Sequence, residues 1–385
     1  MRLPLRYNLR SMTQRKVRTT LTALGVGVAI FVSILMLALS RGLLTSTLNS
    51  ASPTNVIVLS KGAEAMEFSA IDLSVLHLLE SSAQIRVEAG RPLASPEQYI
   101  STFVRLPDQA AMGERRGVVR GVLPVALSVH DQVHIVEGTE PQRGFKVTVG
   151  KLAATKMGVP SDALAVGKMI EYEGQQWTIA GVLEAPGTTF DSEIWAHLDD
   201  LRVVTKRADY SAIVLEAQDP QATDDLLFDL ATRTDIRVDA KTEAAYYAAL
   251  ANAMKPVQAV SLLMTVILIV GASLAGMNTM LTSILGRTRE MGMLLVLGYK
   301  RKAILVSFMI ESILICLAGG ALGVLGGAFL NGLPMRMPMG AFRFAVDPIT
   351  LGTGLGLAAV IGTVGAIVPV WRVARLPTVE ALRSE

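Results

Sequence analysis

The chain has 385 residues, of which 51% are hydrophobic and only 18% are charged, and its mean hydropathy is +0.44. This balance indicates a membrane protein rather than a pair of soluble globular domains. The formal net charge is +3, but the basic residues gather beside apolar segments, which argues against a nucleic-acid-binding face.

Four apolar segments are long enough to cross a bilayer as helices, at roughly 20 residues per crossing. The first, Thr19 to Leu39, contains no charged residue. A cleaved signal peptide is the disfavoured alternative, because its apolar region is about 7 to 15 residues long and precedes an Ala-x-Ala-like site. This segment is longer and is followed by Ser40-Arg41. The expected transmembrane spans are residues 19–40, 257–285, 303–330 and 349–371.

Lys and Arg gather in three places: before the first span, between the second and third spans, and after the last span. The positive-inside bias places all three in the cytoplasm, together with both termini. The long segment between the first and second spans is then translocated, and it holds about 28 acids against about 20 bases. The expected cytoplasmic segments are 1–18, 286–302 and 372–385, and the expected outer segments are 41–255 and 331–348.

The translocated segment alternates short strand-like and helix-like patterns, which predicts a mixed α+β domain. A β-rich stretch of about 121–210 lies between flanks of more mixed pattern, at about 41–120 and 211–255, so we expect two subdomains. The expected strands are 55–59, 98–106, 145–149, 169–172, 177–182 and 212–216, and the expected helices are 71–80, 151–157, 220–232 and 243–254.

No stretch carries the signature of a catalytic or metal site. A phosphate-binding loop needs Gly-x-x-x-x-Gly-Lys-Ser/Thr, and the nearest stretch, Gly144 to Lys151, has one residue too many and continues with Leu152. His130 and His134 have the spacing of two ligands on one helical face, but their segment favours a strand and its turn. We therefore expect no catalytic residue and no metal in this chain.

Glycines recur every four residues in the last two expected spans. Gly319, Gly323 and Gly327 form such a row in the third span, and Gly352 and Gly356 repeat the spacing in the fourth. Small residues at this spacing let helix backbones approach closely, which is how helices gain packing energy in a bilayer. The pattern leaves open whether the neighbouring helix belongs to this chain or to another subunit.

Asn278 and Glu311 are polar residues inside expected spans. A carboxylate at membrane depth is costly and is usually paired or functional. Glu311 therefore either pairs with a cation of the loop 286–302 near the cytoplasmic interface, which we favour, or takes part in proton coupling.

The cytoplasmic loop 286–302 has one apolar side and one polar side. A short amphipathic helix of this kind can lie on lipid or dock in a groove of a partner protein, and periodicity alone does not choose between them. The apolar side carries Met291, Leu294, Leu295 and Leu297, and the polar side carries Arg287, Arg289 and Glu290.

Three segments carry a family pattern. The first holds Tyr-Asn-Leu-Arg at 7–10 and RKVRTTLTALG at 15–25, the second runs over 277–322, and the third is PVWRVARLPTVEALRSE at 369–385. Together they resemble the MacB/FtsX family of ABC transporter permeases, the four-helix mechanotransmission type that includes the lipoprotein-releasing permeases. The translocated domain matches this family only loosely.

The expected fold is therefore an α-helical membrane protein with four transmembrane helices and a large α+β periplasmic domain inserted between helices 1 and 2. The resemblance implies a MacB-like periplasmic domain with a porter-like part (41–120 and 211–255) and a sabre-like part (121–210), and an FtsX-like permease domain at 257–385. It also implies a helix that couples to the ATPase through Arg287, Arg289, Glu290, Met291, Leu294 and Leu297. Gly286 departs from the pattern, because many relatives carry Glu there.

The resemblance implies a permease subunit that binds no cofactor itself and is driven by a separate ABC ATPase, which uses ATP and magnesium. The periplasmic conformational work would export or extract a hydrophobic or amphipathic substrate. The implied setting is the bacterial inner membrane, as a homodimer or as a heterodimer with a related permease, in contact with lipid, a periplasmic adaptor and an outer-membrane channel. The alternative is an FtsX-like regulatory scaffold that activates a periplasmic cell-wall hydrolase.

Overall fold

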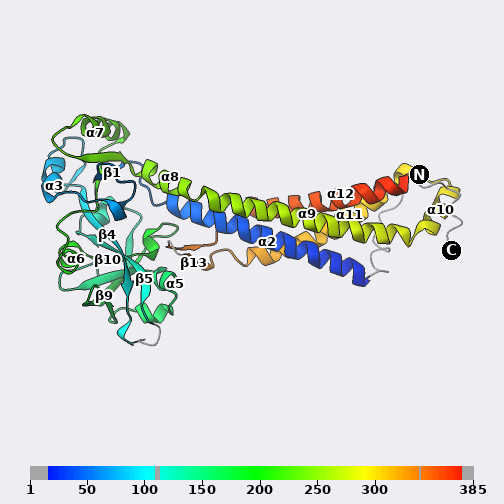
Figure 1. Ribbon diagram of the computed structural model, residues 1–385, viewed down its shortest axis with the longest axis horizontal. Coiled ribbons are helices and arrows are strands. Elements are labelled where there is room, and N and C mark those ends of the chain that lie inside the picture. Colours follow the sequence, from blue (N-terminus) through cyan, green and yellow to red (C-terminus); the bar gives the residue numbers. More distant parts are fainter. Residues whose placement is uncertain (1–15, 109–112, 338–339, 375–385) are drawn as a thin grey trace. The chain divides into compact units, whose positions relative to one another are not determined.

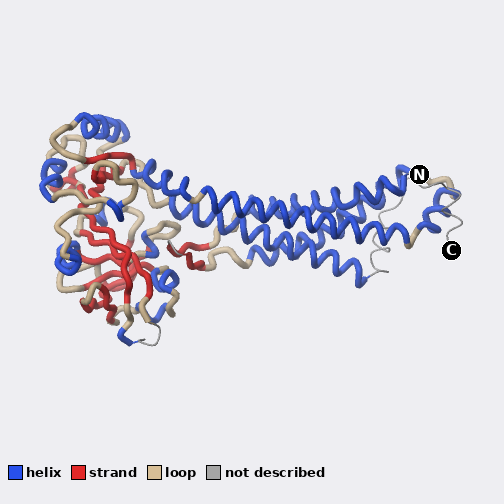
Figure 2. The backbone as a smooth tube through the Cα atoms, in the orientation of Figure 1, coloured by secondary structure: helices blue, strands red, loops and turns tan. Residues whose placement is uncertain are grey.

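The computed structural model describes residues 16–108, 113–337 and 340–374, and these fall into two compact units. The first unit, here called the helical unit, contains the described residues up to Arg41, residues 256–333 and residues from Phe344 onward. The second unit, here called the large domain, contains residues 42–255 and 334–343. In Figure 2 the strands belong to the large domain, whereas the helical unit is drawn as helices.

Four long helices confirm the four expected spans, and each is long and apolar enough to cross a membrane. The first helix has 33 residues, or about 50 Å at 1.5 Å per residue, which exceeds a hydrocarbon core of about 30 Å. Its last turns, from Gly42 onward, belong to the large domain. The long helices are α2 (Lys16–Leu48), α9 (Lys255–Leu285), α11 (Arg301–Ala328) and α12 (Pro348–Ala374), and the short α10 (Thr288–Val296) joins α9 to α11.

The glycine row of α11 lies directly against α2. A Cβ atom added to Gly319 would overlap the carbonyl oxygen of Ala23, and one on Gly323 would lie 2.5 Å from the carbonyl oxygen of Gly27. A Cβ atom on Gly327 would lie 2.7 Å from the side chain of Ile34, on the same helix α2. These contacts are shorter than any Cβ atom tolerates, so glycine is what permits the close crossing of α2 and α11.

The predicted glycine pair of α12 does not pack against another helix of the described chain. A Cβ atom added to Gly352 or Gly356 would meet no described atom within 4 Å, whereas one on Gly354 between them would lie 2.9 Å from Ile34 and 3.1 Å from Val324. The helix face that packs inside this chain is therefore the one that carries Gly354.

The large domain is built on one mixed sheet with the strand order β12-β1-β11-β4-β5-β10-β7-β9-β6, in which β8 also pairs with β9 (Figure 1). β10 runs parallel to β5, β7 runs parallel to β9, and the other pairs are antiparallel. The strands are β1 (Asn55–Ser60), β4 (Ala94–Val104), β5 (Arg115–Val122), β6 (His134–Gly138), β7 (Lys146–Gly150), β8 (Met169–Tyr172), β9 (Gln175–Glu184), β10 (Ile194–His197), β11 (Ala212–Glu216) and β12 (Val238–Thr242).

Several helices of the large domain begin at side chains that satisfy the first backbone N–H groups. Asp72, Asp219 and Thr242 each accept such a hydrogen bond, from Ser74, Ala222 and Ala245 respectively, which is the usual role of an N-cap residue. These caps explain why the expected helices formed where the pattern placed them. The helices are α3 (Leu73–Glu80), α4 (Ala126–Val129), α5 (Ala153–Met157), α6 (Leu198–Thr205), α7 (Pro220–Thr232) and α8 (Glu243–Ala253).

The long strand β4 joins two parts of the sheet. Its first residues, Ala94 to Glu97, pair with β11, and the following ones, Gln98 to Val104, pair with β5. One apolar core lies around Trp177 and a second around Ile213, and a third, around Trp195 and Val214, includes residues from both parts. The mixed α+β character is confirmed, whereas the division into porter-like and sabre-like parts stays a prediction, because one sheet runs through both.

A hairpin of β13 (Pro334–Met337) and β14 (Gly340–Arg343) connects α11 to α12 and belongs to the large domain. A Cβ atom on Gly42 would lie 2.8 Å from the ring of Phe342, which shows how closely the hairpin packs there. The expected outer loop 331–348 thus contributes a structured part of the compact unit that contains residues 42–255.

Replacing Gly319 by Ala should lower the stability of the helical unit by about 1–3 kcal/mol, because the added methyl group overlaps the Ala23 carbonyl. The readout is the thermal unfolding midpoint of the purified protein in detergent. Gly352→Ala is the matched control, since it adds the same methyl group to a helix surface with open space and removes a helix-weakening glycine. Equal midpoints for both variants would contradict the packing role.

Candidate functional site

The short helix α10 divides the expected contact residues into a buried set and an exposed set. Met291 is buried and Leu294 is partly buried in an apolar cluster with residues of α9 and α11. Val296 and Leu297 are 73% and 71% exposed, and Met293 is also exposed. The apolar residues at the surface are therefore Met293, Val296 and Leu297, of which the sequence pattern predicted only Leu297.

Arg287, the residue before α10, forms a buried ion pair with Glu311 of α11. Its Nη1 atom lies 3.2 Å from Glu311 Oε2, and the two side chains are 5% and 6% exposed. An ion pair removed from water holds its geometry tightly, because breaking it leaves an uncompensated charge. Arg287 and Met291 are therefore buried and fasten α10 to the helices, while their expected part in ATPase coupling stays a prediction.

The remaining expected residues of this region occupy separate positions. Glu290 is exposed at the start of α10, and the side chain of Arg289 lies outside the described residues. Asn278 is exposed on α9, and its carbonyl oxygen accepts a hydrogen bond from the Thr282 hydroxyl at 3.1 Å. The structure does not bring Asn278 together with Glu311.

A second constellation, which the sequence pattern did not reveal, lies inside the large domain. Arg120 of β5 donates to both carboxylate oxygens of Glu193, at 2.6 and 2.8 Å, and also to Glu97 of β4. Glu97 in turn lies 2.6 Å from His130 Nε2. All four residues are buried. The only sequence signal is an arginine within the apolar run Val118 to Val122, which is rare unless the charge is paired.

Aromatic rings enclose the Arg120 guanidinium. Its central carbon lies 5.1 Å from the ring centroids of both Tyr99 and Phe190. Trp195 donates its indole N–H to Glu193 at 3.1 Å. A cation that donates to two carboxylates and contacts two aromatic rings is well compensated for the loss of water.

The cluster shifts the ionisation of its members. Burial alone would raise the pKa of Glu97, but the charges of His130 and Arg120 outweigh burial and lower it to about 2. Burial alone would lower the pKa of His130, but Glu97 outweighs burial and raises it. Burial raises the pKa of Glu243, whose Oε1 lies 3.8 Å from His130 Nδ1; neither atom has a hydrogen-bond partner among the described residues.

The two histidines with ligand-like spacing serve no common site. His130 is bound to Glu97, while His134 is exposed on β6. Within the described residues, no group of three or more His, Cys, Asp or Glu side chains has the arrangement of a metal site.

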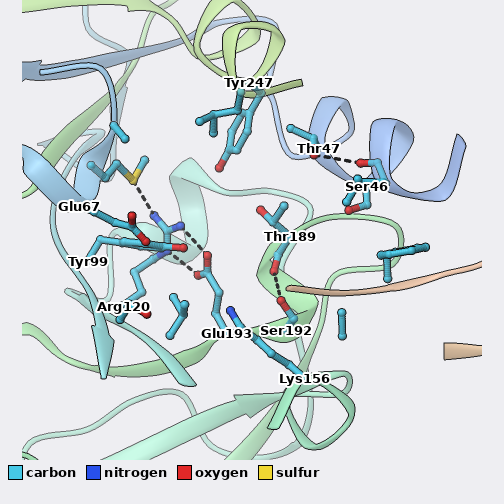
Figure 3. Close-up of a pocket in the computed structure, with 18 of the residues that line it drawn as sticks. Ser46, Thr47, Glu67, Tyr99, Arg120, Lys156, Thr189, Ser192, Glu193 and Tyr247 are labelled. Atoms are coloured by element: carbon cyan, nitrogen blue, oxygen red, sulfur yellow. Dashed lines mark hydrogen bonds and ion pairs between the residues drawn. The ribbon is translucent and has the colours of Figure 1, made fainter. Parts of the chain in front are cut away.

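A cavity of about 320 Å³ lies beside the Arg120–Glu193 pair, within the large domain (Figure 3). Its walls come from the end of α2, the short 3₁₀ turn η1 (Met66–Phe68), β4, β5, the turn before β10, α8 and β14. Lys156 of α5 lines it and is 5% exposed. Burial lowers the pKa of Lys156 to about 8, although Glu193 and Glu67 act in the opposite direction.

Replacing Arg120 by Met should lower the free energy of unfolding of the large domain by about 3–5 kcal/mol, because Glu97 and Glu193 are left buried without their cation. Unfolding is followed through the fluorescence of Trp177 and Trp195. Arg105→Met is the matched control: Arg105 also bridges two acids, Glu114 and Glu171, but half of its side chain is exposed, so about 1 kcal/mol or less is expected. Comparable losses would contradict the role of burial.

The raised pKa of His130 predicts a pH-dependent contribution to stability. A group whose pKa is higher in the folded state stabilises fully below its unfolded pKa of about 6.5 and loses that contribution as the pH rises through the folded pKa. The stability difference between the wild type and His130→Asn should therefore be largest below about pH 6.5 and shrink as the pH rises through the raised pKa of the folded state. A difference that grows with pH would show that His130 is held neutral.

Two family models match the chain. Residues 19–233 match the MacB-like periplasmic core domain, and residues 262–378 match the FtsX-like permease C-terminal domain. Most of the first match lies in the large domain, and most of the second match lies in the helical unit.

Curated relatives align over nearly the whole chain. A macrolide export ATP-binding/permease protein MacB 1 of Yersinia pestis bv. Antiqua is 26% identical over 98% of this chain and 60% of its own length. A macrolide export ATP-binding/permease protein MacB of Bordetella avium is 27% identical over 99% and 60% respectively. The chain therefore spans 60% of the length of these relatives.

Among solved structures, the periplasmic region of MacB from Actinobacillus actinomycetemcomitans aligns with a TM-score of 0.41 and 9% identity, over 54% of this chain and 98% of that chain.

The MacB-like periplasmic core model alone covers more than half of the residues, and the four spans follow one another along the chain in the expected order. This chain belongs to the family of membrane permeases that combine a MacB-like periplasmic core domain with an FtsX-like permease domain.

Proposed function

We propose that the chain is the permease subunit of an ABC transporter, which converts ATP hydrolysis by a separate ATPase into conformational work of its periplasmic domain. The observation that carries this proposal is the exposed apolar edge of α10 on a helix anchored by the Arg287–Glu311 pair. The proposed setting is the bacterial inner membrane with both termini in the cytoplasm, in keeping with the basic residues that flank the spans.

The proposed ATPase contact is the surface formed by Glu290, Met293, Val296 and Leu297. Large apolar side chains exposed together beside a charge are typical of a docking surface for a partner protein. The helix that carries them is fixed from below by Met291 in an apolar cluster shared with α9 and α11. A force applied to α10 would therefore act on both helices at once.

The continuity of α2 supports mechanical transmission. It is one uninterrupted helix from Lys16 to Leu48, and its last residues belong to the large domain. A helix without an intervening loop passes a tilt or shift directly to the domain in which it ends. ATP and magnesium are used by the partner in this proposal, and the permease itself binds no cofactor.

The proposed cargo is a hydrophobic or amphipathic molecule that is exported or extracted by the periplasmic domain. The curated relatives are described as macrolide export proteins, which supports export without identifying the cargo here. The proposed assembly is a homodimer or a heterodimer with a related permease, in contact with lipid, a periplasmic adaptor and an outer-membrane channel.

Leu297→Asp in the tagged full chain should reduce the amount of ATPase retained during mild detergent purification at least about ten-fold, because it puts a charge into an apolar contact. Glu290→Lys should weaken retention as well, through reversed charge. Retained proteins are identified and quantified by mass spectrometry.

Val203→Asp is the matched control, since Val203 is 70% exposed on α6 of the large domain and its replacement should leave ATPase retention unchanged. Wild-type retention by both α10 variants would contradict the proposed contact. Recovery of a periplasmic cell-wall hydrolase without an adaptor would instead support a regulatory scaffold.

A further inference from the structure

The cavity of the large domain lies where the domain's chain connections meet. Leu43 belongs to the end of α2, Met254 follows α8 and directly precedes α9, and Phe342 belongs to the hairpin between α11 and α12. All three line the cavity. Residues from three separate connecting segments of the large domain thus contribute to the lining of this one cavity.

Two buried polar side chains face the cavity without a partner among the described residues. Lys156 is 5% exposed and Tyr247 is 3% exposed. Within the described part of the chain, neither the Lys156 ammonium nor the Tyr247 hydroxyl has a hydrogen bond or an ion pair. Figure 3 shows the ammonium directed toward Glu193 and Ser192, and the hydroxyl directed into the same space.

Both groups are donors at neutral pH. The pKa of Lys156 is about 8, so the amine is mostly protonated, and burial raises the pKa of Tyr247 well above its usual range, so the phenol keeps its proton. An ammonium group offers three N–H donors and accepts nothing. An anionic oxygen placed in the cavity is the group that best satisfies the Lys156 ammonium, and the Tyr247 hydroxyl is a second donor in the same lining.

The other charged residues that line the cavity do not supply that acceptor. Glu193 is held by both of its oxygens on Arg120. Arg116 donates its Nε to the neutral hydroxyl of Ser101 at 2.9 Å. Glu67 is exposed, and it raises the pKa of Lys156 only through its charge at a distance. The described lining thus has three cations against two acids, and one of those acids is already neutralised.

The rest of the lining is largely apolar. Leu43, Leu250, Met254 and Phe342 form walls that suit a hydrocarbon group. A volume of about 320 Å³ is at the lower end of the range for ligand sites, roughly 300–1,000 Å³. It fits a short amphiphile, or the charged end of a longer one.

We propose that this cavity binds an amphipathic anion, with its carboxylate or phosphate on Lys156, with Tyr247 as a second donor in the lining, and with its apolar part against the walls beside α2, α8 and β14. The binding is independent of the export function; only the further step, that the anion is cargo, rests on the proposed function. The anion can come from a free amphiphile or from a lipid headgroup, since both present the same oxygen acceptors.

The test measures binding of radiolabelled octanoate to the full chain in nanodiscs of phosphatidylcholine. Saturable binding near one octanoate per chain is expected, with octyl phosphate as a competitor and octylamine as a charge-reversed control that does not compete. If a lipid headgroup is the natural occupant, nanodiscs of phosphatidylglycerol should reduce octanoate binding to the wild type.

Lys156→Met and Tyr247→Phe should each weaken octanoate binding at least about ten-fold, whereas Lys61→Met, which removes an exposed lysine outside the cavity, should not. Lys156→Met should also unfold at no lower temperature than the wild type, because it removes a buried charge. Tyr247→Phe removes only the hydroxyl group and keeps the ring, so it still tests the proposed site if Lys156→Met does not fold. Unchanged binding in both cavity variants, or equal competition by octylamine, would overturn the proposal, and neither result depends on an ATPase.

Discussion

The buried guanidinium of Arg120 is the interaction on which the large domain depends. It lies on β5, between β4 and β10 in the sheet order, and it binds a carboxylate from β4 and another from the residue that precedes β10. Removing a cation and two anions from water is expensive, so the geometry must satisfy nearly every donor and acceptor at once. Three neighbouring strands are therefore held in one register by charge as well as by their backbone hydrogen bonds.

The same cluster forms one wall of the cavity, which links the fold to the proposed binding site. Glu193 accepts hydrogen bonds from Arg120 and Trp195, and it forms no hydrogen bond or ion pair with Lys156 among the described residues. A buried lysine thereby keeps its donors for a ligand, although acids lie nearby in space. The chemistry of the cavity thus follows from how the charges of the domain core are paired.

The helical unit is held together by close helix packing and one buried ion pair. Its helices approach closely only because glycines at 319 and 323 leave room for the backbone of α2, and dispersion contacts supply the attraction in a bilayer. The Arg287–Glu311 pair adds an ionic contact that fixes the short α10 to a transmembrane helix. This rigid attachment supports the proposed transmission of force through α10.

The local sequence pattern was sufficient to predict many of the helices and strands of the large domain. The helix Pro220–Thr232 and the strands Met169–Tyr172 and Ala212–Glu216 have the predicted bounds, because caps, glycines and alternation act over a few residues. β5 and β10 escaped prediction because Arg120 interrupts the apolar run of β5 and because β10 has only four residues. The hairpin Pro334–Arg343 was expected only as a loop, since its packing surface lies on distant residues.

The sequence by itself determined the four spans, the inserted mixed domain and the family, because hydropathy, flanking charge and short motifs are local properties. Only the tertiary structure decided that Arg287 and Met291 are buried while Met293 and Val296 are exposed, and that Lys156 and Tyr247 line the same cavity. Which charges meet is settled by sheet order and helix packing, and these bring together residues whose spacing along the chain carries no signal.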